Sequence, residues 1–292
     1  MAIRKILLPL SGVASASAAL ATGVMLAKRW QAHLYALHVR TDTRDVAPLA
    51  GEGLSGAMIE EMMANTELEG SSEARALAAL FDEVTARLGI AVGAPVADAP
   101  CTAPEPTARF ESLIGREEEM VAAEARLSDL IVVPHPRSAE EVTSADALHC
   151  VLFDSGRPAL IAPAVPQERI GARIAIAWNG TAESASAVAS VLPWLPAADS
   201  VRILRADQYQ RHGPPAQRLA EFLALHGIAA EIAEFAPVDR SVGAGLLAGA
   251  TEFGADLLAM GAYSHSRLRQ LILGGVTRHV LEHAKLAVLM NR

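Results

Sequence analysis

The chain repeats one pattern of apolar and polar segments once along its length. Lys5–Gly12 in the first half and Arg173–Gly180 in the second are both apolar runs that end in a small polar residue and a glycine. A second matched pair, Ser128–Pro134 and Ala255–Gly261, lies near the end of each half. The repeat period of roughly 170 residues is too long for a solenoid, whose repeats span roughly 20–50 residues. The sequence therefore predicts two copies of one domain.

The apolar runs are continuous rather than alternating, which is typical of strands buried on both faces. They alternate with segments of helical length, and this order predicts βαβ units with a parallel sheet. We therefore expect two doubly wound α/β domains, residues 1–163 and 171–292, packed as an intramolecular pair. The linker, at Ala162–Gly171, is short, so the two sheets should lie against each other.

The local signals place most elements. In the second half we expect strands near 172–178, 200–205, 229–235, 256–260 and 286–290, and helices near 182–194, 214–227, 240–253 and 275–284. Asp239 is suited to cap the third of these helices, and Gly227 and Gly254 are suited to end helices. In the first half we expect a helix from Ala14 to Trp30, a long helix reaching Leu88, a loop over 91–106 and a strand near 108–113.

Composition narrows the classes of function. The net charge of −8 argues against a general nucleic-acid surface. No apolar run approaches the ~20 residues that span a bilayer, and the first residues lack a signal-peptide pattern, so we expect a soluble, cytoplasmic protein. Cys101 and Cys150 fit neither a metal spacing nor a disulfide framework, and we interpret them as reduced thiols.

The segment Gly261–Gly275 connects a predicted strand to a predicted helix and is rich in glycine. Such a connection places free backbone N–H groups at a helix start, where phosphate can bind. Between Gly261 and Arg278 there are three arginines and no acidic residue, whereas the matching segment 134–147 contains three acidic residues and no glycine. Alternatively, a glycine pair at a helix start allows another segment of the protein to pack closely against the backbone. Residue types alone do not distinguish this packing contact from a phosphate site.

The spacing of this segment resembles that of the universal stress protein family. The family's signature is Gly, two residues, Gly, nine residues, Gly, then Ser or Thr; here the four positions hold Gly261, Ser264, Gly274 and Gly275. The first and third positions match, while Ser264 replaces a glycine and Gly275 replaces the hydroxyl residue. The resemblance extends over both halves. It implies a five-stranded parallel sheet in each, with strand order 3-2-1-4-5, and edge pairing through residues near 158–162 and 286–290.

Many members of that family bind ATP, and others have lost it. The acidic residue that binders carry after the first strand is Asn179 here, and Ser11 in the first half. By the same positional match, Ala177 and Ala206 would line the adenine pocket, Met260 and Gly261 the ribose end, and the phosphates would face these residues: Ser264, Gly274, Gly275 and Val276. Both replacements in the loop are expected to weaken binding, although the Ser264 hydroxyl could itself bond a phosphate oxygen.

The resemblance implies a sensing or regulatory module that holds ATP or ADP, accompanied by Mg²⁺, in the second half, and that acts on a protein partner. A nucleotide-free interaction scaffold of the same fold is the alternative, and either form could associate as a homodimer. An ATP-dependent ligase or hydrolase is disfavoured, because the loop has no catalytic carboxylate or lysine. We therefore expect no enzyme activity beyond slow ATP hydrolysis.

Three further motifs have two interpretations each. His279 and His283, four residues apart on a predicted helix, could hold zinc but lack an evident third ligand, so surface histidines are the preferred interpretation. Met58, Met62 and Met63 form either a packing face of a helix or a groove for a partner. His265 and Ser266 have no acidic residue in their loop to complete a catalytic triad, so loop-surface polarity is preferred.

Overall fold

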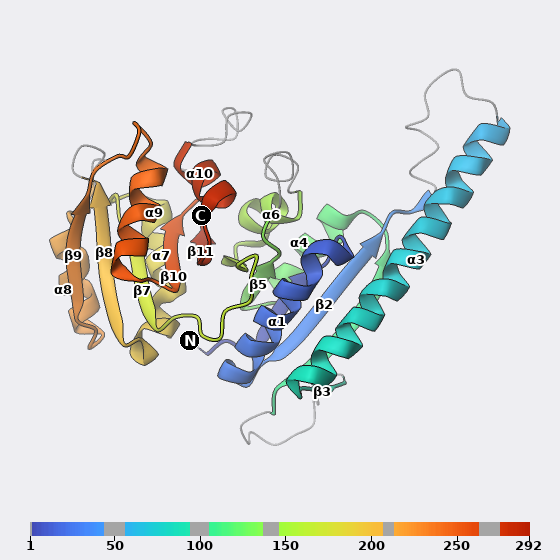
Figure 1. The fold of residues 1–292 in the computed structure, drawn as a ribbon, viewed down its shortest axis with the longest axis horizontal. Coiled ribbons are helices and arrows are strands. Elements are labelled where there is room, and N and C mark those ends of the chain that lie inside the picture. The colour runs from blue at the N-terminus through green and yellow to red at the C-terminus, as the bar shows by residue number, and fades with distance from the viewer. Residues whose placement is uncertain (1, 44–55, 94–104, 137–145, 207–212, 263–274) are drawn as a thin grey trace.

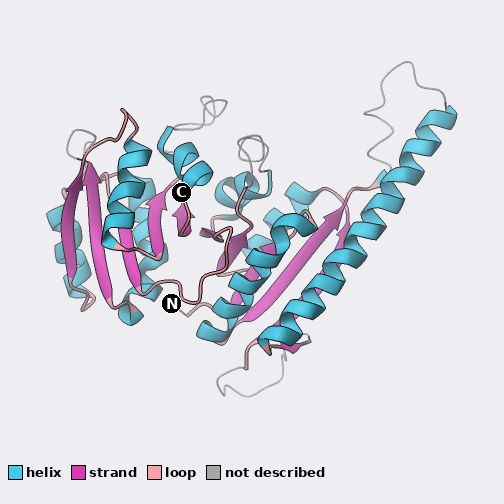
Figure 2. Cartoon of the chain, viewed as in Figure 1, coloured by secondary structure: helices cyan, strands magenta, loops and turns pink. Residues whose placement is uncertain are grey.

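In the part of the chain that the structure describes, eleven strands form one sheet, in the order β3-β4-β2-β1-β5-β6-β11-β10-β7-β8-β9. The computed structural model describes residues 2–43, 56–93, 105–136, 146–206, 213–262 and 275–292 (Figure 1). Helices cover both faces of the sheet (Figure 2). Among the described residues, none of the helices combines the length and the apolarity that crossing a membrane requires.

Both halves alternate strands and helices. The first contains β1 (Lys5–Pro9), α1 (Val13–Trp30), β2 (His33–Arg40), α3 (Gly56–Leu88), β3 (Ala91–Val92), β4 (Thr107–Ile114), α4 (Glu117–Arg126), β5 (Leu130–Val133), α6 (Asp146–Cys150), the π-helical η2 (Val151–Ser155) and β6 (Ala159–Ile161). The second contains β7 (Arg173–Ala177), α7 (Ala182–Val191), the 3₁₀-helical η3 (Leu192–Ala197), β8 (Ser200–Ala206), α8 (Ala216–Leu225), β9 (Ala230–Phe235), α9 (Val242–Phe253), β10 (Leu257–Gly261), α10 (Gly275–His283) and β11 (Ala287–Asn291).

The predicted fold class and strand order are confirmed. Within the second half the strands run β9-β8-β7-β10-β11, which is the order 3-2-1-4-5, and all of these pairs are parallel. The first half has the same order in β4-β2-β1-β5-β6. It adds the two-residue strand β3 at the outer edge of β4, within a segment predicted to be a loop. The pairing of Val92 with Ala108 accounts for this addition.

The two halves join through their last strands, as the resemblance implied. Strand β6 pairs antiparallel with β11, with Leu160 opposite Leu289, so the two five-stranded sheets become one. Two core clusters lie on the two faces of this sheet: Ile174 and Ile176 of β7 belong to one, and Ala175 between them belongs to the other. Both clusters contain residues of both halves, so the halves share their cores.

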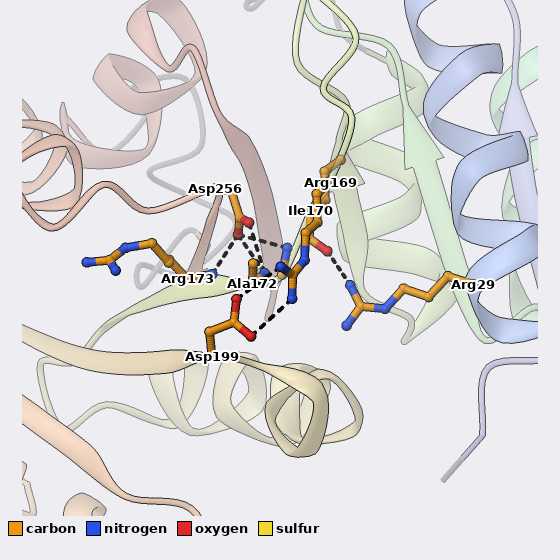
Figure 3. A network of polar contacts seen from close by, with 8 residues as sticks. Arg29, Arg169, Ile170, Ala172, Arg173, Asp199 and Asp256 are labelled. Carbon is orange, nitrogen blue, oxygen red and sulfur yellow. Dashed lines mark hydrogen bonds and ion pairs between the residues drawn. The ribbon is translucent and has the colours of Figure 1, made fainter.

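A second contact between the halves lies at the linker (Figure 3). Arg29 of α1 donates a hydrogen bond from Nη1 to the Ile170 carbonyl oxygen. Its guanidinium carbon lies 5.3 Å from the ring centroid of Trp30 and 5.1 Å from that of Trp194. The two indoles meet edge to face, with ring centroids 5.5 Å apart. This cluster fixes the end of α1 against η3 of the second half.

Two local predictions were wrong. The N-cap of α9 is Ser241, whose hydroxyl accepts a hydrogen bond from the Ala244 N–H; Asp239 instead has a positive φ of 48° in the preceding turn. Helix α7 ends at Val191 rather than near residue 194, because Pro193 has no N–H to continue the α-helical bonding and the chain tightens into η3. Gly227 and Gly254 do take positive φ values at the ends of their helices, as predicted.

Candidate functional site

Two chain corners, Asn179–Gly180 after β7 and Met260–Gly261 at the end of β10, lie at one edge of the sheet. Strands β7 and β10 are parallel neighbours, with Ile176 opposite Ala259, so their carboxyl ends lie side by side. The strand order reverses between them, and ligands of open α/β sheets bind at such a switch point. Strands β10 and β11 are also parallel, so the intervening helix α10 begins at this same edge.

Gly261 has a packing role at this edge. A β-carbon at Gly261 would lie 2.6 Å from the carbonyl carbon of Glu183 and 2.7 Å from the backbone nitrogen of Ser184. Any side chain would therefore push β10 away from the first turn of α7. The glycine is explained by this close approach, and it does not by itself indicate a ligand.

Asn179 stabilises the turn that leads into α7. Its Oδ1 accepts hydrogen bonds from the Thr181 N–H, at 3.1 Å, and from the Thr181 hydroxyl, at 2.9 Å. Thr181 is the N-cap of α7 and its hydroxyl oxygen accepts a bond from the Ser184 N–H at 3.4 Å. The amide oxygen of Asn179 therefore stabilises the N-cap of α7.

A contact that the sequence did not predict lies over the adjacent glycine. Gly180 has φ of +80°, and a β-carbon on Gly213 would lie only 2.1 Å from the Gly180 carbonyl oxygen. The Trp178 indole N–H donates to the Pro214 carbonyl oxygen at 2.9 Å. The segment before α8 therefore touches the end of β7. The sequence Gly213-Pro214-Pro215 indicates a turn before α8, but it does not indicate that this turn contacts Trp178 and Gly180.

The start of α10 is open. Gly275 is exposed, and no atom of the residues that the structure describes would lie within 4 Å of a β-carbon built on it. The first N–H groups of any α-helix lack partners within the helix. Arg278, one turn on, forms an ion pair with Glu282 at 2.7 Å. The other two glycine-signature positions, Ser264 and Gly274, lie outside the described residues, as do His265 and Ser266.

The remaining predicted site residues lie at the carboxyl ends of strands or, for Val276, in the first turn of α10. Met260 is buried in the core beneath the edge, and Val276 packs against the same core cluster. Ala177 ends β7 and is half-buried, and Ala206 ends β8 opposite Phe235 of β9. These residues bring the ends of three neighbouring strands to one edge together with the start of α10.

The equivalent corner in the first half has a different character. The exposed Ser11 donates a hydrogen bond from its hydroxyl to Glu117, in the acidic first turn of α4. A β-carbon on Gly12 would lie 3.4 Å from a carboxylate oxygen of Glu73. Carboxylates thus flank this corner, an arrangement that disfavours an anionic ligand.

Some titratable groups of the described residues lie outside this edge of the sheet. Among the described residues there is no group of three His, Cys, Asp or Glu side chains placed to hold a metal ion. The rings of His279 and His283 stack with centroids 4.2 Å apart, and burial together with His283 lowers the pKa of His279. Burial, followed by nearby Glu117, raises the pKa of the buried Cys150 thiol to about 12, so the thiol stays protonated and unreactive. Cys101 lies outside the described residues.

Comparison with known proteins agrees with this architecture. The model of the universal stress protein family matches residues 172–292. The comparison with curated proteins found no match. The chain is similar to a universal stress protein from Archaeoglobus fulgidus DSM 4304, with a TM-score of 0.67 and 14% identity over 99% of this chain and 98% of that chain. It is also similar to a functionally unknown protein from Pseudomonas aeruginosa PAO1, with a TM-score of 0.54 and 16% identity over 99% and 92%. Residues 172–292 therefore form a universal stress protein domain, and the chain over its full length has the universal stress protein fold.

Proposed function

We propose that the second half binds an adenine nucleotide, ATP or ADP, at the carboxyl edge of β7, β8 and β10, and that this binding regulates a protein partner. The observation that carries the proposal is the open start of α10, at the same edge as the two strand corners. Among the described residues, none has an atom within 4 Å of a β-carbon on Gly275, and we place a phosphate in that space. The positive end of the helix dipole would contribute roughly 0.3–1 kcal/mol per anionic group there.

Gly275 supports the proposal more strongly than Gly261 does. Gly261 is required by its contact with Glu183, whereas no described neighbour requires a glycine at position 275. A glycine without a packing partner at a helix start permits close approach of a ligand to the backbone. We assign Gly275 and Val276 to the phosphates, together with Ser264 and Gly274 on the basis of the resemblance.

The base and ribose would lie over Ala177, Asn179, Ala206, Met260 and Gly261. Because Oδ1 of Asn179 is held by Thr181, we assign the contact with the nucleotide to its Nδ2 amide group. An amide supplies a hydrogen bond but no charge. Mg²⁺ would accompany the nucleotide on its phosphates. With no catalytic carboxylate or lysine assigned to the site, we propose binding without multiple turnover.

One observation favours the alternative function, a nucleotide-free scaffold of the same fold. Gly213 lies directly on Gly180, and Trp178 is bonded to Pro214, so the end of β7 is already in contact with protein. On this alternative, the edge would present a fixed surface to a partner rather than a pocket to a nucleotide.

Calorimetric titration of ATP and of ADP, each with and without Mg²⁺, separates the two functions. The most informative variant is Gly275→Glu, because a carboxylate in the first turn favours the helix but repels phosphate. We expect it to fold normally and to bind nucleotide at least about tenfold more weakly. Gly56→Glu is the matched control, since Gly56 also begins a helix and a β-carbon there meets no atom of the described part of the chain within 4 Å.

The proposal fails if millimolar ATP and ADP give no binding heat with the unaltered chain, and the scaffold then becomes the better explanation. It also fails if Gly275→Glu and Gly56→Glu bind nucleotide equally well. Steady release of phosphate over many turnovers would overturn the assignment of binding without catalysis.

A further inference from the structure

Helix α3 extends well past the sheet on which it packs (Figure 1). Strand β2 ends at Arg40, which pairs with Ile114, the last residue of β4. A β-carbon on Gly70 would lie 3.6 Å from the Arg40 side chain, so Gly70 is level with the ends of both strands. Residues 56–69, here called the α3 overhang, therefore lie beyond these two strands, over about 21 Å at ~1.5 Å per residue.

The core holds only the far end of this helix. The buried residues of α3 are Leu77, Phe81, Val84 and Thr85, all in its last half. The α3 overhang contains no buried residue. A helical segment of about this length is marginal in water without a packed face. Among the described residues, the overhang thus has no face packed into the core, and a partner helix would add such a packed face.

The α3 overhang carries an apolar stripe in line with the packed face. Ile59, Met62, Met63 and Thr66 follow the i, i+3, i+4, i+7 spacing of one helix face. At 100° per residue, Ile59 and Leu77 fall on the same side. Met62 is 40% exposed, and Ile59 and Met63 are half-buried. The methionines therefore continue the packing face beyond the sheet, and unbranched, polarizable side chains of this kind adapt to varied partners.

Glutamates flank this stripe on both sides. Residues 56–74 contain Glu60, Glu61, Glu67, Glu69 and Glu73 and no lysine or arginine. In helical projection Glu60 and Glu67 lie on one side of the stripe and Glu69 lies on the other. Glu73 lies in line with the stripe beyond the overhang, where its carboxylate would be 3.4 Å from a β-carbon on Gly12. Arg40 neutralises Glu67 through an ion pair at 3.1 Å. Glu60 and Glu69 therefore leave one negative charge on each side of the apolar stripe, and Glu61 lies on the opposite face of the helix.

We propose that the α3 overhang is a docking surface for a basic amphipathic helix of a partner protein. The partner's apolar face would lie on Met62 and Met63, and its lysines or arginines would meet the glutamates. A second copy of this chain is the poorer occupant, because pairing two overhangs would set glutamates against glutamates. An anionic lipid surface is repelled for the same reason. This surface is separate from the carboxyl edge of the second half and does not depend on nucleotide binding there.

The test uses the full chain and a synthetic 18-residue helix of leucine and lysine as the probe, with binding measured by fluorescence anisotropy. We expect saturable binding that weakens as salt is raised. Met62→Gln with Met63→Gln should lower the affinity by about tenfold, because glutamine keeps helix propensity and removes apolar area. Leu68→Gln is the matched control: Leu68 is 69% exposed on the same helix but lies opposite the stripe, and this change should have no effect.

A second pair of variants separates this surface from general negative charge. Glu60→Gln with Glu69→Gln should weaken binding by about threefold, more at low salt. Glu118→Gln with Glu119→Gln, in the acidic first turn of α4, should leave it unchanged. The proposal is overturned if the probe does not bind, or if the Leu68 or α4 variants weaken binding as much as the stripe variants. A chain dimer that the stripe variants dissociate would also overturn it, in favour of a second copy.

Discussion

The carboxylate of Asp256 accepts a hydrogen bond from the backbone N–H of Gly171, with the nitrogen 2.8 Å from Oδ1 (Figure 3). The same carboxylate accepts from the N–H groups of Ala172, at 2.9 and 3.0 Å, and of Arg173, at 3.1 Å. One side chain at the start of β10 thus holds the end of the linker and the start of β7. In the first half, Asp129 accepts from the N–H groups of Arg4 and Lys5 in the equivalent position.

Asp256→Asn should therefore destabilise the protein. Asparagine removes the charge and turns one acceptor into a donor that faces N–H groups. We expect the free energy of unfolding to fall by about 2 kcal/mol, which is typical for the loss of a charged acceptor. Urea denaturation followed by far-UV circular dichroism measures this change. Asp199→Asn is the control, because its ion pair with Arg169 is exposed and should contribute no more than about 1 kcal/mol. Equal effects would contradict the role of Asp256.

Gly171→Ala should destabilise more than Gly156→Ala. Both glycines have positive φ, +84° and +67°, so alanine costs roughly 1–2 kcal/mol at either position. At Gly171 the new β-carbon would also lie 2.9 Å from the buried Trp194 ring and 3.0 Å from Arg29, whereas at Gly156 it meets nothing within 4 Å. We expect overpacking to add about 1–3 kcal/mol at Gly171. Thermal and urea unfolding of the two variants would measure this difference. Equal losses in the free energy of unfolding would show that Trp194 and Arg29 can move to accommodate the new β-carbon without destabilising the protein.

Most of the fold could be predicted because its local signals agree with its tertiary structure. Continuous apolar runs such as Lys5–Pro9 and Leu257–Gly261 are buried strands, and the matched aspartates before the fourth strand of each half mark one repeated fold. The error at the start of α9 arose because two nearby residues are both suited to cap the helix. Asp239 and Ser241 both suit an N-cap, and only the turn geometry selects Ser241. The two-residue strand β3 forms because its partner β4 is nearby, which no local pattern reveals.

The candidate site could be predicted only in part. The position of its corners follows from the strand order, which the resemblance to the universal stress protein family implied. The roles of individual residues depend on distant contacts: Gly261 faces Glu183, and Gly180 lies under Gly213. A sequence pattern shows that a glycine is present but cannot distinguish contact with a ligand from contact with a helix. At Gly275 the family signature has Ser or Thr, so the signature does not explain the glycine. The argument for a ligand there is that no described residue has an atom within 4 Å of a β-carbon at this position.

Gly261→Ala should reduce stability whether or not the protein binds nucleotide. The β-carbon would lie 2.6 Å from a backbone carbon of Glu183, and neither β10 nor the first turn of α7 can move without disturbing the core. We expect a loss of about 1–3 kcal/mol in the free energy of unfolding. Gly275→Ala, which meets no atom of the described residues within 4 Å, should change stability by less than about 1 kcal/mol or increase it, since alanine favours a helix. If both variants are equally stable, the packing role of Gly261 is wrong.

Acid should destabilise the first half through His33. Burial lowers the pKa of His33, and the nearby positive charges of Lys5 and Arg109 lower it further, while its Nδ1 bonds to the Thr107 hydroxyl at 2.8 Å. The unfolded chain, with a histidine pKa of about 6.5, therefore binds a proton before the folded chain does, so stability contributed by neutral His33 is present above about pH 6.5 and is lost as the pH falls below it. His33→Asn removes this titration and keeps a polar atom near the position of Nδ1. The free energy of unfolding, measured by urea denaturation at about pH 7 and about pH 5, should fall less in His33→Asn than in the unaltered chain, and equal falls would assign the acid sensitivity to other groups.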